Sequence, residues 1–599
     1  MAQNFAQHRW FHPLLLLIWI VIGASLRCTQ LASKPPWTDE FSTLMASLGQ
    51  SFQTVPLDQV ISLERLLQPL RLNPQAGASL VIQHLLTEDV HPPLYFVLAH
   101  WWLRLFPTNS DVELIWAARS LPAFLGTISI PALFFLGRLA FRSTLVAQMA
   151  AAMMAVSPLA VFLAQEARHY TLAILWVIAS LGCLMMALRC LARQIPLPIW
   201  LSCAWVGINA LGMATHYFFI LTLCAQALVL LVFCLAQIRA GQPVWQQPAW
   251  RRLCGPILGT AIALLAWLPI WITLRSSSQT QWLQTGNHML FLQLINPICQ
   301  SLAAWVTMLF LLPVESTNIW VVVGSGAAML AFLVWLLPVL HRGLSAQQSD
   351  PDAYLSIQGL GGFVLGAIAI FFAITYGLGA DLTRGARYSF VYFPAVVVLI
   401  GASLATYWRQ SSLGGKLSRS LGLQAKASST PSPFILSTLK GRQIVTLVWF
   451  MGLAGSLTVV SNLGYQKYYR PDQMMPLLQN HSQNSVLIAT THHTLVQVGE
   501  MMGLAWEWRS QQRRGISSAS NTPAPQFLLA HEAQNPCLQD CFATQLLHEQ
   551  VEQLLHPLDV WLVNFHAPAE FETDQTCQRI DLKTKPYING YAYEGYHCS

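Results

Sequence analysis

Ionisable and aromatic side chains collect in a few short segments that border long apolar runs. Two adjacent carboxylates, Asp39 and Glu40, stand in "KPPWTDEFSTLMASL". The other segments are "HPPLY", "QEARHY", "THYF" and "DLTRGARYS". Their candidate side chains are His91, Glu166, Arg168, His169, Tyr170, His216, Tyr217, Arg384, Arg387 and Tyr388. Each segment alone also has a simple reading, as solvated surface, a helix start or an interfacial anchor.

Taken together, these residue types indicate a particular chemistry. Arginine binds phosphate oxygens through a fixed fork of donors. A carboxylate suits a general base that takes a proton from an attacking hydroxyl. The combination predicts nucleophilic displacement at a carbon that bears a lipid-linked phosphate, with the arginines stabilising charge on the departing phosphate. A sugar on a polyprenyl phosphate is the natural substrate for such a site.

The composition places these residues in a polytopic membrane protein. The 599 residues are 54% hydrophobic and 10% charged, whereas soluble domains carry about 25% charged residues. Apolar runs of the length that spans a bilayer, about 17–25 residues, recur from Leu14 to Val460. The net charge of +7 is spread over short loops, so it indicates topology rather than binding of nucleic acid.

We expect about eleven transmembrane helices, the first being a retained signal anchor. They are placed at 11–28, 118–140, 144–163, 170–191, 197–214, 217–237, 254–274, 318–340, 357–378, 388–408 and 443–461. With a cytoplasmic N-terminus, the cytoplasmic loops carry Arg9, Arg138, Arg142, Arg189, Arg193, Arg239, Arg251, Arg252, Arg342 and the basic residues of 409–442. This agrees with the positive-inside rule and puts all the candidate side chains on the outer face of the plasma or inner membrane.

Two further apolar stretches are too short to span the membrane. If only one of them crossed it, every later loop would change sides and the charge pattern would be lost. We interpret 91–106 and 296–313 as interfacial or re-entrant helices on the outer face. The predicted domains are a transmembrane module at 1–408 with a first outer loop at 29–117, a flexible cytoplasmic linker at 409–442, a last transmembrane helix at 443–461 and an extracytoplasmic domain at 462–599.

The last domain is more polar and predicts a small α/β fold. "NSVLIATTHHTLVQV" and "PLDVWLVNF" are typical of buried strands, and "CFATQLLHEQVEQLL" is typical of a helix between them. Its His492–His493 pair is interpreted as structural or surface. Four cysteines lie in this domain, namely Cys537, Cys541, Cys577 and Cys598. They allow three pairings, and disulfides among them would fit an oxidising compartment.

Several motifs, in their order along the chain, resemble the family 39-like glycosyltransferases of the GT-C superfamily. They are "WTDEFSTL", "HPPLYFVLAHWWLRLF", "RSLPAFLGTISIPALFFLGRLAFR", "SPLAVFLAQEARHYTLAILW", "THYFFILTLCAQ" and "RYSFVYFPAVVVLIG", and they cover roughly residues 10–410. This superfamily includes protein O-mannosyltransferases and lipid A aminoarabinose transferases. The resemblance implies a polyprenyl-phosphate sugar donor, inversion at the anomeric carbon and an active site on the outer membrane face.

The resemblance also implies roles for individual residues. Asp39 is the general base, and Glu40 orients or holds the acceptor. His91 belongs to the His-Pro-Pro segment, Arg168 and Tyr170 match an Arg-x-Tyr after the third helix, and Arg387 and Tyr388 match an Arg-Tyr pair near the lipid-phosphate pocket.

Cofactor, acceptor and class of protein are left partly open by these motifs. Some relatives bind a divalent ion at the acidic pair, so Asp39, Glu40 and His216 form a metal hypothesis, and no cofactor is firmly expected. The chain lacks an obvious MIR-type insertion, so a lipid, glycan or protein acceptor stays open. The alternative reading is a transporter or flippase of lipid-linked sugars, but midplane charges and paired repeats, the usual signs of one, are not evident.

Overall fold

The computed structural model describes residues 9–89, 91–106, 110–274, 290–421, 440–514, 523–532, 541–568, 571, 577–582 and 585–599. It divides the chain into two compact units, each made from two separate segments. Unit 1 contains residues 1–31 and 119–465, and unit 2 contains residues 32–118 and 466–599.

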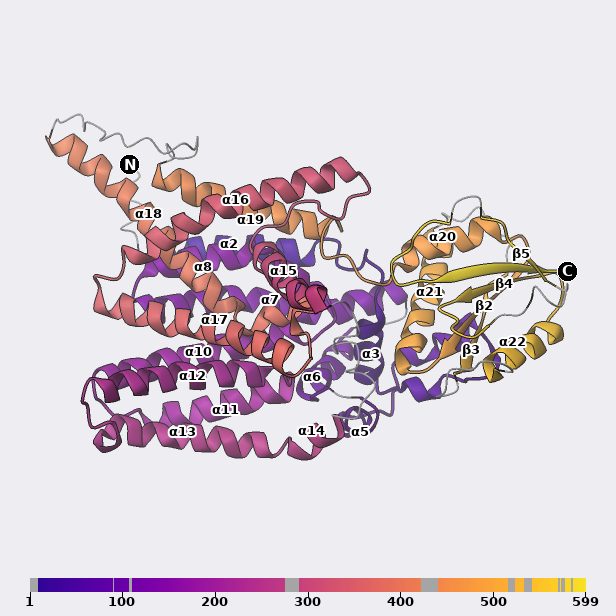
Figure 1. Cartoon of the computed structure of the whole chain (residues 1–599), viewed down its shortest axis with the longest axis horizontal. Coiled ribbons are helices and arrows are strands. Elements are labelled where there is room, and N and C mark those ends of the chain that lie inside the picture. The colour runs from indigo at the N-terminus through magenta and orange to yellow at the C-terminus, as the bar shows by residue number, and fades with distance from the viewer. Residues whose placement is uncertain are drawn as a thin grey trace. The chain divides into compact units, whose positions relative to one another are not determined.

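Unit 1 is a bundle of long apolar helices, which Figure 1 shows running side by side. Seven helices in the described part of the chain are long and apolar enough to cross a membrane, and they are α2 (Phe11–Cys28), α7 (Asp111–Phe141), α10 (Tyr170–Ala192), α12 (Phe219–Arg239), α16 (Ile319–Ser345), α17 (Pro351–Gly377) and α19 (Gly441–Val460). The pair α8 (Thr144–Ala155) and α9 (Pro158–Ala164), bent by 57°, counts as an eighth if it is one span. The fold is therefore that of a polytopic helical membrane protein.

The remaining predicted spans are helical but shorter, broken or displaced. Residues 197–214 correspond to α11 (Ile199–Thr215), and residues 254–274 are divided into α13 (Pro248–Leu265) and α14 (Leu268–Leu274). The predicted interfacial stretch at 296–313 falls largely in α15 (Leu290–Thr307), which begins earlier than expected. The span predicted at 388–408 begins in the 3-10 helix η6 (Ala386–Val391) and continues as α18 (Phe393–Leu421).

The first part of the predicted linker is helical. Helix α18 continues to Leu421, so residues 409–421 extend the helix beyond the predicted end of the span. Residues 422–439 of that linker lie outside the described residues. Within the bundle, α18 packs closely on α8. The approach is so close that a Cβ at Gly401 would lie 2.7 Å from the backbone nitrogen of Ala150. Small residues allow such close approach of membrane helices.

Unit 2 is built around a six-stranded mixed sheet with the order β1-β3-β2-β4-β6-β5. Strands β2 (Ser485–His492), β3 (Gln526–His531) and β4 (Leu558–Val563) are parallel, and β6 (Tyr593–Cys598) and β5 (Cys577–Arg579) add an antiparallel edge. Helix α22 (Phe542–Gln553) covers one face, while α20 (Pro471–His481) and α21 (Leu495–Arg514) pack together on the other side of the strands (Figure 1). The predicted strands and helix of this α/β domain are thus confirmed.

The first predicted outer loop is part of this unit. Strand β1 (Val60–Ser62) pairs antiparallel with β3, and Ile61 lies opposite Phe527. The loop also forms α3 (Thr38–Ser47), α4 (Leu63–Leu66), α5 (Ala78–Thr87), α6 (Leu94–Leu103) and the 3-10 helices η1 (Phe52–Thr54) and η2 (Gln68–Leu70). The sequence predicts this loop as part of the transmembrane module, whereas in the structure its strand pairs with the C-terminal segment.

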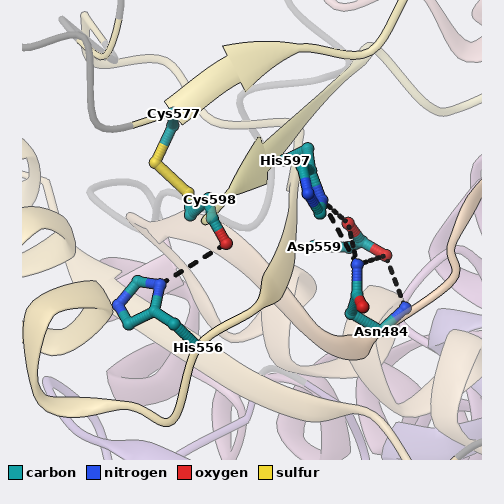
Figure 2. The surroundings of a disulfide bond; sticks show 6 residues. All are labelled: Asn484, His556, Asp559, Cys577, His597 and Cys598. Atoms are coloured by element: carbon teal, nitrogen blue, oxygen red, sulfur yellow. Dashed lines mark hydrogen bonds and ion pairs between the residues drawn. A yellow bond between two sulfur atoms is a disulfide. The ribbon is translucent and has the colours of Figure 1, made fainter.

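A disulfide and a buried carboxylate fix the antiparallel edge of the sheet (Figure 2). Cys577 and Cys598 are bonded, while Cys541 is buried and Cys537 lies outside the described residues. Asp559 on β4 is 2% exposed and accepts hydrogen bonds from His597 Nδ1 at 2.8 Å and from the backbone N–H groups of Gln483 and Asn484 at 2.8 and 2.9 Å. Burial alone would raise the pKa of Asp559, but these donors outweigh it and the pKa is lowered.

We predict that Asp559→Asn destabilises unit 2 by about 1–3 kcal/mol, because a charge-assisted network loses its acceptor. Since the pKa of Asp559 is lower in the folded state, its stabilisation is present above the unfolded pKa of about 4 and is lost as the pH falls through the folded pKa. The unfolding temperatures of the wild type and Asp559→Asn should differ at pH 6 and become similar in more acidic buffer. If the unfolding temperatures of the wild type and Asp559→Asn differed by the same amount at all pH values, ionised Asp559 would not have this stabilising role.

Candidate functional site

The acidic pair lies in the first turn of α3 in unit 2. Glu40 is fully buried, Asp39 is half-buried, and the helix begins with the Glu40 N–H donating to the Trp37 carbonyl at 2.9 Å. Carboxylates are favourable here because the N-terminus of a helix carries a partial positive charge. The pair is therefore held on a defined element, unlike a solvated surface pair.

A hydrogen-bonded chain joins the same helix to His91. Ser42 lies one turn after Asp39 on α3, and its hydroxyl donates to Asp89 Oδ2 at 3.0 Å. The other oxygen of Asp89 is 2.8 Å from His91 Nδ1. Asp89 therefore orients the His91 ring and connects the "HPPLY" segment to α3. Asp89 is not among the residues predicted from the sequence, although it stands only two residues before His91.

Helix α6, which follows His91, completes the packing around α3. Tyr95 and Phe96 are fully buried, and the His91 ring lies 5.7 Å from that of Phe96. Buried His100 hydrogen-bonds the Ser47 carbonyl near the end of α3 through Nδ1 at 2.8 Å. The predicted interfacial helix at 91–106 is therefore a packed structural element of unit 2.

Unit 1 brings four of its candidate side chains into one aromatic cluster. The His169 and His216 rings are 4.5 Å apart, Tyr170 lies 5.5 Å from His216, and Tyr388 lies 6.5 Å from His216. Phe218 and Phe390, which sequence reasoning missed, fill the space between them, with ring distances of 4.7 Å from Phe218 to Tyr388 and 4.8 Å from Phe390 to His216. The cluster joins the start of α10, the α11–α12 junction and η6.

The backbone fixes one of these rings directly. His216 follows the last residue of α11, and its Nδ1 accepts a hydrogen bond from the Phe218 N–H at 3.0 Å. That bond places a ring proton on Nε2. Arg387 adds a cation to the cluster, because its guanidinium carbon lies 5.7 Å from the centre of the Tyr388 ring.

The "QEARHY" segment is buried and held by its preceding residue. Glu166 and Arg168 are 1% and 3% exposed. Gln165 donates through Nε2 to the carbonyls of Leu26, Arg27 and Thr29 at 3.2, 3.4 and 2.9 Å. Since these carbonyls end α2, Gln165 ties the segment to the first helix.

Two predicted residues of unit 1 contact other groups. The Tyr217 ring packs on the Trp267 ring at 5.6 Å. Arg384 Nε lies 3.5 Å from Asp381 Oδ2, and Asp381 also accepts from the Thr383 hydroxyl at 2.6 Å. Arg384 therefore has a buried carboxylate beside it.

The metal hypothesis gains no support from the described residues. Among them, no group of three or more His, Cys, Asp or Glu side chains is arranged to hold a metal ion. Asp39 and Glu40 belong to unit 2, and His216 belongs to unit 1.

Comparison with known proteins gives structural similarities only. No protein-family model matches the chain, and no curated protein does. ArnT from Cupriavidus metallidurans is similar over 97% of both chains, with 11% identity and a TM-score of 0.46 when bound to undecaprenyl phosphate, and with 12% and 0.47 in the apo state. The archaeal oligosaccharyltransferase AglB from Archaeoglobus fulgidus, in complex with an inhibitory peptide and a dolichol-phosphate, is 13% identical with a TM-score of 0.43, over 83% of this chain and 64% of its own.

Proposed function

We propose that this protein is a GT-C type membrane glycosyltransferase that transfers a sugar from a polyprenyl-phosphate donor to an acceptor hydroxyl, with Asp39 as general base. The observation that carries the proposal is the placement of Asp39 in the first turn of a packed helix that Asp89 links to His91. A carboxylate on a rigid element is held in a productive position more precisely than one on a solvated loop.

The proposed reaction is an inverting displacement. The acceptor oxygen forms a bond to the anomeric carbon while the bond from that carbon to the phosphate oxygen breaks. The proton of the acceptor hydroxyl passes to the Asp39 carboxylate, and the bonding electron pair leaves with the polyprenyl phosphate. Glu40 orients the acceptor, which is a lipid, a glycan or a protein.

The donor phosphate is assigned to the arginines of unit 1. Arg387 stands beside the Tyr388 ring, and Arg168 is buried next to the His169–Tyr170 pair. A guanidinium beside aromatic rings and apolar helices has fewer competing waters, so its interaction with phosphate is stronger than in bulk solvent. The lipid tail would then lie against the apolar bundle.

The proposed orientation puts unit 2 outside the cytoplasm. The Cys577–Cys598 disulfide supports this, since such bonds persist in oxidising compartments. The basic residues of the loops expected inside support it as well.

The orientation can be measured with reporters fused after Arg252 and after Ser461 in otherwise intact membranes. We expect a cytoplasmic signal from the first fusion and an extracytoplasmic signal from the second, because loop arginines remain inside. The opposite result at either fusion point would overturn the proposed orientation.

The base assignment predicts that Asp39→Asn lowers transfer by about 100-fold or more, because the amide cannot take the proton. Glu40→Gln should lower it less, and Glu64→Gln, an exposed acid of unit 2, should have no effect. A deletion strain first shows by lipid and glycan profiling which lipid-linked sugar accumulates. That sugar then serves as donor for the purified variants, and full transfer by Asp39→Asn would sink the assignment.

The phosphate assignment predicts that Arg387→Ala weakens binding of undecaprenyl phosphate by about tenfold or more, since a hydrogen bond to a charged group contributes about 1.5–3 kcal/mol. Arg239→Ala, at the exposed end of α12, is the matched control. Equal affinities of the two variants in a detergent binding assay would count against this role.

A further inference from the structure

Helix α21 of the C-terminal segment lies directly against the start of α3. It presents Gly499 and Gly503, one helical turn apart, to that helix. A Cβ at Gly499 would lie 3.2 Å from Thr38 Cα and 3.3 Å from its Cβ and Cγ2. Thr38 is the residue before Asp39. The absence of a side chain at 499 therefore sets how closely α21 approaches the acidic turn.

Aromatic packing holds the same turn from the side. The rings of Phe41 and Trp506 meet edge to face at 6.0 Å, and both residues are buried. Lys467 Nζ lies 5.1 Å from the centre of the Trp37 ring, just before the helix begins. Residues on both sides of Asp39 and Glu40 thus contact the C-terminal segment.

A buried acid anchors α21 next to Gly499. Glu500 is 3% exposed, and its Oε2 accepts from Asn564 Nδ2 at 2.8 Å. It is also hydrogen-bonded to the Tyr469 hydroxyl. Asn564 follows β4 and donates to the Gly590 carbonyl at 2.9 Å as well, so the cluster connects α21 to the sheet.

The same cluster lies within electrostatic reach of the proposed base. Burial raises the pKa of Tyr469 most, the Glu500 carboxyl adds to it, and Asp39 contributes further in the same direction. Burial also raises the pKa of Glu500, although the Tyr469 and Asn564 hydrogen bonds oppose this. Asp39 therefore has a small electrostatic effect on Tyr469, and Glu500 is next in sequence to Gly499, which contacts Thr38.

We infer that α21 is the positioning element for Asp39: Gly499 sets the position of the acidic turn, and the Glu500–Tyr469–Asn564 cluster holds α21 in place. This inference rests on the function proposed above, and it gives the C-terminal segment a role in transfer. Gly499 and Glu500 act through Asp39, so they are positioning residues.

The test compares Gly499→Ala with Gly503→Ala in the full-length protein. Both changes give α21 the same gain in helix propensity, about 1 kcal/mol. A Cβ at Gly503 meets Phe41, Pro471 and Tyr591 only at the ordinary distance of 3.8 Å. A Cβ at Gly499 instead requires Thr38 to shift by a few tenths of an ångström. Misplacement of a catalytic group by about 1 Å can lower the rate about 100-fold. Because the shift at Gly499 is smaller than 1 Å, we expect Gly499→Ala to lower kcat about fivefold and Gly503→Ala to leave it within about twofold.

Two further measurements distinguish a positioning role of Gly499 from a purely structural one. Hydrogen exchange should become faster in peptides covering residues 38–47 of Gly499→Ala, while binding of undecaprenyl phosphate stays unchanged. If Gly499→Ala matches Gly503→Ala in exchange and in kcat while Asp39→Asn is inactive, the inference is wrong and the proposed function stands. Full activity of Asp39→Asn would instead overturn the proposed function and the inference together.

Glu500 provides a rescue experiment. Glu500→Gln keeps an oxygen that can accept from Asn564 and Tyr469, so we expect near-normal kcat and exchange. Glu500→Ala removes the acceptor and leaves Asn564 and Tyr469 without it, so we expect a loss similar to that of Gly499→Ala. Equal kcat values for the two Glu500 variants would remove Glu500 from the positioning role.

Discussion

The antiparallel pairing of β1 with β3 is the interaction on which the arrangement of unit 2 depends. Without Val60–Ser62, β3 would present an unpaired edge. Asp58 strengthens this strand pairing, because its carboxylate accepts a hydrogen bond from the His531 backbone N–H at 2.8 Å and lies 2.7 Å from His531 Nδ1. This pairing connects two distant parts of the sequence, so residues 32–118 fold with residues 466–599. The acidic helix α3 consequently belongs to the same structural unit as the sheet.

In unit 1, buried polar groups determine where the helices end. Arg27 is fully buried, and its guanidinium donates to the carbonyls of Gly23, Ala155 and Met154 at 2.9, 3.2 and 2.9 Å. Gln165 then satisfies carbonyls at the end of α2. In apolar surroundings such groups need partners. These bonds therefore fix the segment that carries Glu166 to Tyr170, and the aromatic cluster forms around its last two residues.

The positions of helices could be predicted from the sequence better than the segments and side chains that they contact. Hydrophobic runs located α2 at the bounds that the structure shows, and they located β2 and β4, because length and periodicity are local signals. The stretch predicted around β2 continues into α21. The three-residue strand β1 has no such signal, so the first loop was assigned to the wrong neighbour. The site shows the same limit. His169, His216 and Tyr388 lie in one aromatic cluster, whereas Tyr217 packs on Trp267 and Arg384 lies beside Asp381.

The two acids of unit 2 that matter most have opposite surroundings. Glu500 is buried with hydrogen-bond donors around it, while Asp39 is half-buried at a helix N-terminus. Burial favours the neutral form of Glu500, which suits a group that holds structure. Partial exposure leaves Asp39 accessible to an acceptor hydroxyl. Gly499 is next to Glu500 in sequence and contacts Thr38, the residue before Asp39. A glycine at this position costs α21 about 1 kcal/mol relative to alanine, but it allows the close helix contact that connects Glu500 to the turn carrying Asp39.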